Sequence, residues 1–195
     1  MEPLIHLILP LTALTLLGVD FRKALPLALF GLLPDLDALL LIHRSLSHSL
    51  PVLLAFAAGA ALLAYAVKPG LRNYIVLATL ATASHPILDL FTGYTPILWP
   101  LSSHSLWVKT ELGVHIGGSL TLLPSVKLLA QPTTFHRLES LDAPLFTGEG
   151  LITSLILTAP LILKAVRGHY QPHTDTSQES PNEPRSQTLK IESQE

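Results

Sequence analysis

The stretch SLPVLLAFAAGAALLAYAV (residues 49–67) decides the fold class, because it contains no charged side chain. Crossing about 30 Å of hydrocarbon as an α-helix takes roughly 20 mostly apolar residues. Comparable stretches lie on both sides of it, so the sequence predicts a multi-spanning membrane protein. Six spans are expected, at residues 4–19, 24–42, 49–67, 74–91, 112–130 and 150–166.

The composition agrees with a membrane protein. Hydrophobic residues make up 49% of the 195 residues and charged residues 13%, about half the share usual in soluble proteins. The prediction is an all-α transmembrane bundle of about six helices, in one domain over residues 1–167. The tail, residues 168–195, is rich in Gln, Ser, Pro, Thr and Glu and is predicted to be disordered. A soluble bundle with unusually apolar helices is the alternative.

Charge and cysteine usage limit the partners and the metal chemistry. A net charge of −2 offers no basic footprint for nucleic acid, so no nucleic-acid partner is expected. The chain has no cysteine, so a bound metal must rest on imidazole and carboxylate ligands. The N-terminus lacks a basic stretch and an A-x-A cleavage site, so it is interpreted as a retained helix.

The unusual polar residues gather at one end of the predicted helices. Successive spans run in opposite directions, so residues at the start of one span and the end of the next share a membrane face. That arrangement brings nine residues together: His6, Asp35, Asp37, His43, His48, His85, Asp89, His104 and His115. Carboxylates at membrane depth cost a few kcal/mol each and usually mark a functional interior.

The local spacings suit a metal site. His85 and Asp89 are four residues apart and share one face of a helix. Asp35 and Asp37 follow Pro34, where a helix start or kink can turn a carboxylate inward. Mixed His and Asp ligands favour zinc, with manganese and ferrous iron as alternatives. Each of these residues also has a purely structural explanation, such as helix capping by Asp35 and Asp37.

Three motifs resemble the family of membrane-bound metal-dependent hydrolases. They are LLPDLD (residues 32–37), HRSLSHS (residues 43–49) and SHPILDL (residues 84–90), with His6 as the early histidine of that pattern. Residues 92–100 fit the same family, and the resemblance covers roughly residues 1–130. It implies a small multi-spanning hydrolase that depends on a metal.

A more distant similarity is to zinc-dependent phospholipase C and related nucleases. It implies metal ligands at His6, Asp35, His48, His85, Asp89, His104 and His115. The chain departs from that pattern at Ser119, where a carboxylate is expected, and this puts a third metal of such a cluster in doubt.

The hypothesis that follows is hydrolysis of a phosphoester of a lipid or other amphiphile by a metal-activated water, with one or two ions, zinc first. Metal ligands are expected at His6, Asp35, His43, His48, His85, Asp89, His104 and His115. Asp37 is expected to orient a ligand or act as general base, and Arg44 to hold the phosphate. Expected partners are membrane lipids and the phosphoester substrate.

Three alternatives stay open: a transporter or ion relay, a membrane protein with a structural metal, and a lipid phosphatase of the vanadate-sensitive type. Basic residues set the orientation through the positive-inside rule. With Arg22, Lys23, Lys68, Arg72 and Arg137 inside, the site is expected on the extracytoplasmic side of the cell membrane.

Overall fold

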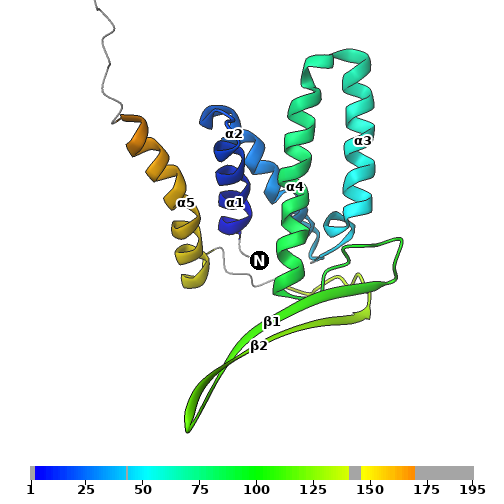
Figure 1. The fold of residues 1–195 in the computed structure, drawn as a ribbon. Coiled ribbons are helices and arrows are strands. Elements are labelled where there is room, and N and C mark those ends of the chain that lie inside the picture. Colours follow the sequence, from blue (N-terminus) through cyan, green and yellow to red (C-terminus); the bar gives the residue numbers. More distant parts are fainter. Residues whose placement is uncertain (1–2, 43, 141–145, 170–195) are drawn as a thin grey trace, which may run out of the picture.

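The computed structural model describes residues 3–42, 44–140 and 146–169 of the chain (Figure 1). Its α-helices are α1 (Pro3–Leu16), α2 (Phe21–Ala28), α3 (Leu50–Val67), α4 (Arg72–Thr92) and α5 (Gly148–His169). Short 3-10 helices connect them: η1 (Leu29–Leu32), η2 (Pro34–Leu40), η3 (Leu46–His48) and η4 (Pro69–Leu71). Two strands, β1 (His104–Gly117) and β2 (Ser119–Pro132), form an antiparallel hairpin.

The helices stand roughly side by side, and the hairpin lies across the end where α4 finishes (Figure 1). α3 and α4 form an antiparallel pair joined by η4, and α5 packs on α1. The Thr12 hydroxyl donates to the Leu157 carbonyl across that contact, at 3.2 Å. The Lys164 ammonium donates to the Thr15 carbonyl further along, at 2.9 Å.

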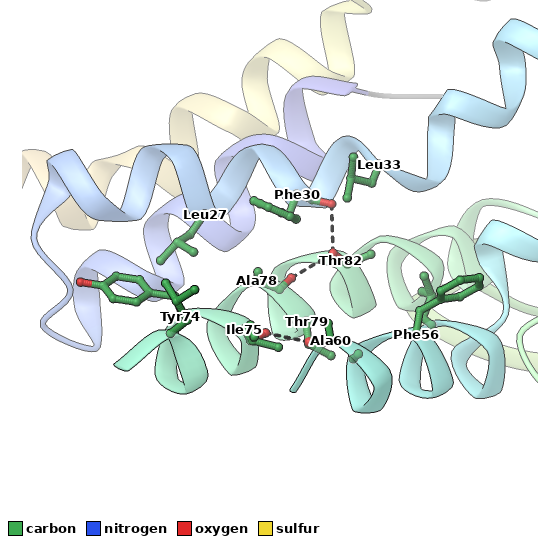
Figure 2. Close-up of a pocket in the computed structure, with 13 residues that line it drawn as sticks. Leu27, Phe30, Leu33, Phe56, Ala60, Tyr74, Ile75, Ala78, Thr79 and Thr82 are labelled. Atoms are coloured by element: carbon green, nitrogen blue, oxygen red, sulfur yellow. Dashed lines mark hydrogen bonds between the residues drawn. The ribbon is translucent and has the colours of Figure 1, made fainter. Parts of the chain in front are cut away.

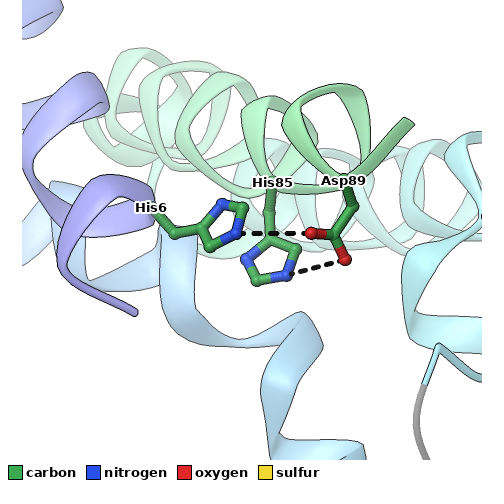
Figure 3. Close-up of side chains that lie close together, drawn as sticks. All are labelled: His6, His85 and Asp89. Atoms are coloured by element: carbon green, nitrogen blue, oxygen red, sulfur yellow. Dashed lines mark ion pairs between the residues drawn. The ribbon is translucent and has the colours of Figure 1, made fainter. Parts of the chain in front are cut away.

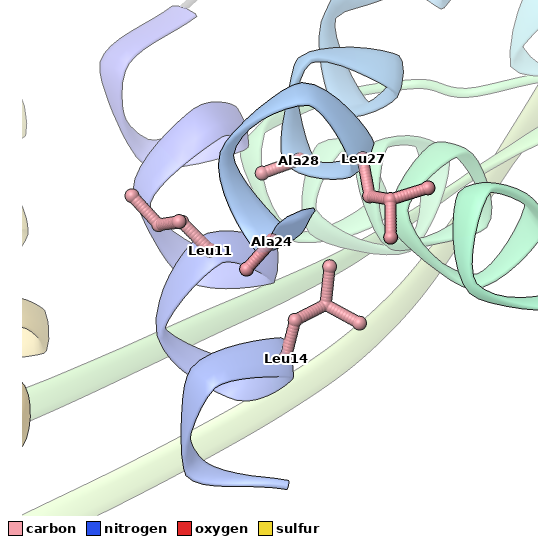
Figure 4. Packing of buried hydrophobic residues seen from close by; sticks show 5 residues of the cluster. All are labelled: Leu11, Leu14, Ala24, Leu27 and Ala28. Carbon is pink, nitrogen blue, oxygen red and sulfur yellow. The ribbon is translucent and has the colours of Figure 1, made fainter. Parts of the chain in front are cut away.

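A small apolar core holds α1 against α2. Leu11 and Leu14 of α1 interlock with Ala24, Leu27 and Ala28 of α2 (Figure 4). The two alanines have no side chain beyond Cβ, so the helices can approach closely. This contact fixes the direction in which the chain leaves α2 toward the polar cluster.

Three helices are long and apolar enough to cross a membrane: Leu50–Val67, Pro69–Thr92 and Gly148–Val166. α3 is apolar almost throughout, yet Ala64 is its one buried residue. Such a surface is stable in hydrocarbon and costly in water. α1, with 14 residues, is shorter than a full span.

The predicted span at residues 24–42 is wrong. α2 ends at Ala28, and the chain continues as η1 and η2 to Leu40. Leu41 then adopts a left-handed conformation, with φ of 58°. Pro34 cannot donate a backbone hydrogen bond, which favours the break. This irregular segment carries Asp35 and Asp37.

The predicted span at residues 112–130 is also wrong, and with it the all-α class. This region belongs to the β1–β2 hairpin, which turns at Gly117–Ser119. Even-numbered positions are nearly all apolar and odd-numbered ones mostly polar, a period of two that indicates strands. Because Leu112 pairs with Pro124 and Ile116 with Leu120, even positions share one face of the hairpin.

The hairpin changes the predicted position of Arg137, and the predicted tail is largely outside the described residues. Arg137 bridges Ile42 by backbone pairing, so it lies at the cluster end of the molecule, not with Arg22 and Lys68. α5 extends to His169, two residues past the predicted domain end. Residues 170–195, which make up most of the predicted disordered tail, lie outside the described part.

Candidate metal centre

Four segments bring the polar cluster together. His6 comes from α1, Asp35 and Asp37 from η2, His48 from η3, and His85 and Asp89 from α4. The side chain of Asp35 is 13% exposed, whereas the other five are at most 4% exposed. Figure 3 shows His6, His85 and Asp89 converging. Most of this charge is therefore buried, with Asp35 at its accessible edge.

Four donor atoms enclose a common point. The Nε2 atom of His85 lies 3.3 Å from Asp35 Oδ1 and 3.8 Å from Asp89 Oδ2. The Nε2 atom of His48 lies 3.8 Å from the same Asp35 oxygen and 3.4 Å from the same Asp89 oxygen. A tetrahedral zinc ion with bonds near 2.0–2.1 Å sets its ligand atoms about 3.4 Å apart. The four separations are close to that spacing, and the ligand atoms of Asp35, His48 and His85 form one group of three, which suits an ion with three protein ligands and one open position.

Contacts at the Nδ1 atoms of His85 and His48 orient the two rings so that their Nε2 atoms face the centre. The Nδ1 atom of His85 lies 2.7 Å from the Gly31 carbonyl, which can only accept, so Nδ1 carries the proton and Nε2 is free to ligate. The Nδ1 atom of His48 lies 3.3 Å from Asp37 Oδ2. This is the carboxylate–histidine arrangement that orients metal ligands.

Asp37 is itself fixed as a carboxylate. The backbone N–H of Ser45 donates to its Oδ2 at 2.7 Å, and the Ser47 hydroxyl lies 3.1 Å from the same oxygen. Burial alone would raise the pKa of Asp37, but the hydrogen bonds from His48 and Ser45 hold it below the usual value. Asp37 is therefore ionised, and its carboxylate orients the His48 ring.

Several atoms of the cluster are buried without hydrogen-bond partners among the described residues: His85 Nε2, Asp89 Oδ2 and both carboxylate oxygens of Asp35. Buried polar groups are nearly always hydrogen-bonded. One or two cations bound in the cluster would give these atoms a partner.

His6 extends the cluster toward α1. Its ring stacks on that of His85, with centroids 3.7 Å apart, and its Nε2 lies 3.5 Å from Asp89 Oδ1. Ligand atoms of His6, His85 and Asp89 form one group, and those of Asp35, His48 and His85 form a second. His85 belongs to both, so the arrangement offers room for one ion or for two that share ligands.

Arg44 lies at the edge of the centre and contacts Asp89. It has a left-handed backbone, with φ of 56°, which costs energy for a residue with a side chain. Its Nε lies 3.2 Å from Asp89 Oδ2. The two Nη atoms donate to the Tyr94 carbonyl at 3.2 Å and the Thr92 hydroxyl at 2.8 Å. Arg44 therefore joins Asp89 to the end of α4.

The structure separates two predicted ligands from the centre. His104 begins β1 and His115 lies near the hairpin turn, and both are exposed. The prediction placed His104 in the loop after the fourth span and His115 at the start of the fifth, whereas both belong to β1 of the hairpin. His43 lies outside the described residues.

Gly31 is the functional residue that sequence reasoning missed. Its carbonyl holds His85 in place, and a Cβ on it would collide with the His6 carbonyl. A glycine inside a predicted helix costs about 1 kcal/mol relative to alanine and can mark a packing constraint, and this signal could have been noticed.

The Asp37→Asn substitution is expected to weaken metal binding. An amide can donate to His48 Nδ1, which leaves the proton on the nitrogen that should ligate. Loss of such an orienting carboxylate typically costs roughly 10–100-fold in metal affinity, measurable by competition with a chromogenic chelator. Asp20→Asn is the matched control, because Asp20 is an exposed helix cap that Asn replaces well. Equal affinities in both variants would contradict the orienting role.

Membrane-crossing helices around a buried histidine–aspartate cluster define a membrane protein with a candidate metal site. The chain matches the family model of the YdjM inner membrane protein over residues 1–159, and it belongs to that family. No curated protein and no solved structure matches it.

Proposed function

We propose that the protein is a membrane-embedded hydrolase that uses a divalent metal, zinc in the first instance, to cleave a phosphoester of a lipid or other amphiphile. The observation that supports this most is the set of four inward donor atoms on Asp35, His48, His85 and Asp89, at 3.3–3.8 Å. When bound there, such an ion supplies Lewis acidity and an activated water at neutral pH.

The protein's own groups have distinct tasks in this proposal. Asp37 keeps His48 in the ligating tautomer, and the Gly31 carbonyl does the same for His85. Of the five N–H donors of a guanidinium, Arg44 uses two for the Tyr94 carbonyl and the Thr92 hydroxyl, and its Nε lies beside Asp89. The remaining two are suited to a phosphate oxygen. Arg44 and Asp35 are also the more exposed members, at 14% and 13%, so substrate approaches from their side.

The distribution of charge supports an extracytoplasmic site. Arg22 and Lys23 begin α2, and Lys68 and Arg72 flank η4 between α3 and α4. These elements lie at the end of the helices opposite the cluster (Figure 1). The positive-inside rule places the basic end in the cytoplasm.

Elemental analysis of the detergent-purified chain, paired with hydrolysis assays on bis(p-nitrophenyl) phosphate, tests the proposal. We expect about one zinc ion per chain in the tetrahedral arrangement, hydrolysis that a chelator abolishes, and recovery on adding zinc. Hydrolysis that survives complete removal of metal would contradict a metal-dependent mechanism.

A structural metal is the second candidate. If Asp35, His48, His85 and Asp89 all bind one ion, no position stays open for water, as is typical of structural zinc. A stoichiometric ion whose removal lowers the melting temperature, with no hydrolysis of phosphomonoesters, phosphodiesters or phospholipids, would establish that alternative.

A further inference from the structure

An apolar groove runs between the α2–η1 segment, α3 and α4 (Figure 2). Its volume is about 440 Å³, within the range of small-molecule sites. Leu27 and Phe30 line one wall, Phe56 and Ala60 of α3 another, and Ile75 of α4 the floor. Two of its walls, α3 and α4, are long and apolar enough to cross the membrane, so we place the groove within the bilayer.

One end of the groove is lined by residues that lie close in sequence to the metal centre. Thr82, which lines the groove, stands three residues before His85 on α4. Leu33, which lines the same end, stands two residues before Asp35. From Tyr74 to Thr82, α4 rises about 12 Å at 1.5 Å per residue. This length is somewhat less than half of the roughly 30 Å hydrocarbon core, and it lies in the half of α4 nearer Arg72.

The groove offers little to a polar ligand. The Thr79 hydroxyl donates to the Ile75 carbonyl at 2.7 Å. The Thr82 hydroxyl donates to the Ala78 carbonyl at 2.9 Å and lies 3.2 Å from that of Phe30. Both hydroxyls are thus directed at backbone and not at the space. Phe30 and Phe56, 42% and 76% exposed, leave the groove open to the side, where lipid chains can enter.

We propose that this groove holds one hydrocarbon chain of an amphiphilic substrate, with the polar end of that substrate at the centre formed by Asp35, His48, His85 and Asp89. The assignment of the polar end rests on the proposed function. A chain moving from bilayer to groove gains little hydrophobic energy, because lipid is already apolar. The groove therefore acts by positioning: it aligns the phosphoester with the metal centre, where a misplacement of about 1 Å can cost on the order of a hundredfold in rate.

Photolabelling tests the groove without any assay of activity. The full chain in nanodiscs is irradiated with a phosphatidylglycerol that carries a diazirine in one acyl chain, and the labelled residues are mapped by mass spectrometry. We expect labels concentrated on Ile75 and Ala78, and several-fold fewer after Ala60→Phe fills the space. Ala58→Phe is the matched control, because Ala58 is exposed on the same helix and does not line the groove.

Labels spread evenly around α3, or unchanged by Ala60→Phe, would mean ordinary boundary lipid and would overturn the proposal. Crosslinks from a second copy of the chain at the same residues would overturn it too.

Hydrolysis then tests the link to the centre. The probes are methyl p-nitrophenyl phosphate and dodecyl p-nitrophenyl phosphate, which share the scissile bond and differ in the chain. Ala60→Phe is expected to lower the ratio of dodecyl to methyl hydrolysis roughly tenfold, because the long chain loses its alignment, and Ala58→Phe to leave that ratio unchanged. An unchanged ratio in Ala60→Phe would overturn the alignment. If the wild-type chain hydrolyses neither probe, the proposed function fails, and the photolabelling alone decides the groove.

Discussion

His85→Ala is expected to remove the metal from the purified protein and to reduce phosphoester hydrolysis to the uncatalysed level. Among the described residues, His85 is the one shared by both groups of possible ligands, so its loss breaks either arrangement. The effect should exceed the roughly 10–100-fold that loss of an orienting partner costs. Elemental analysis and the rate on bis(p-nitrophenyl) phosphate measure it.

Two other histidines are matched controls for this substitution. His104→Ala and His136→Ala each remove an exposed imidazole, and both should keep metal and activity. His104 also tests the predicted ligand set directly, because the resemblance to zinc-dependent phospholipase C implies a ligand there. Full metal content in His85→Ala would rule out the proposed centre, provided that the variant inserts and elutes as the wild-type chain does.

Gly31→Val is expected to destabilise the protein and to lower its metal affinity together. A Cβ at Gly31 would overlap the His6 carbonyl and press on Pro10 Cγ at 3.2 Å. The obstacle is backbone, so α1 must move away from η1. Overpacking of this kind costs about 1–3 kcal/mol. The same movement shifts the carbonyl that holds His85 and separates His6 from the cluster.

Thermal unfolding in detergent and a chelator competition measure the two effects. Gly31→Ala should show them in milder form, which keeps the test valid if the valine variant does not fold. Gly59→Ala is the control, because nothing lies within 4 Å of the corresponding Cβ position and alanine favours a helix interior. Equal melting temperatures and metal affinities for Gly31→Ala and Gly59→Ala would contradict the close approach.

The part of the site that could be predicted is the part carried by local spacing and helix direction. His85 and Asp89 share a helix face, and the ends of neighbouring helices meet, so the convergence of His6, Asp35, His48, His85 and Asp89 followed from the chain alone. Arg44 was also expected beside this group, and it contacts Asp89. The three long apolar helices could be predicted because hydrocarbon demands such length and composition.

The remaining features depend on information that hydropathy does not carry. Residues 112–130 are apolar enough for a span, but their alternation has period two, and average hydropathy is blind to period. The interruption of the helix at residues 29–40 accompanies contacts of Asp35 with His85 and of Asp37 with His48. Such tertiary contacts cannot be derived from hydropathy. The role of the Gly31 carbonyl cannot be predicted from side-chain patterns, because the group that contacts His85 is a backbone oxygen.

The alternation in the β1–β2 hairpin has a consequence for how this part of the chain can change. Even positions such as Val114, Ile116 and Leu120 share one face, and shifting a strand by one residue sends every side chain to the opposite face. Single replacements in the hairpin are therefore easily absorbed. A one-residue insertion or deletion inverts everything beyond it, so changes in length here should come in pairs.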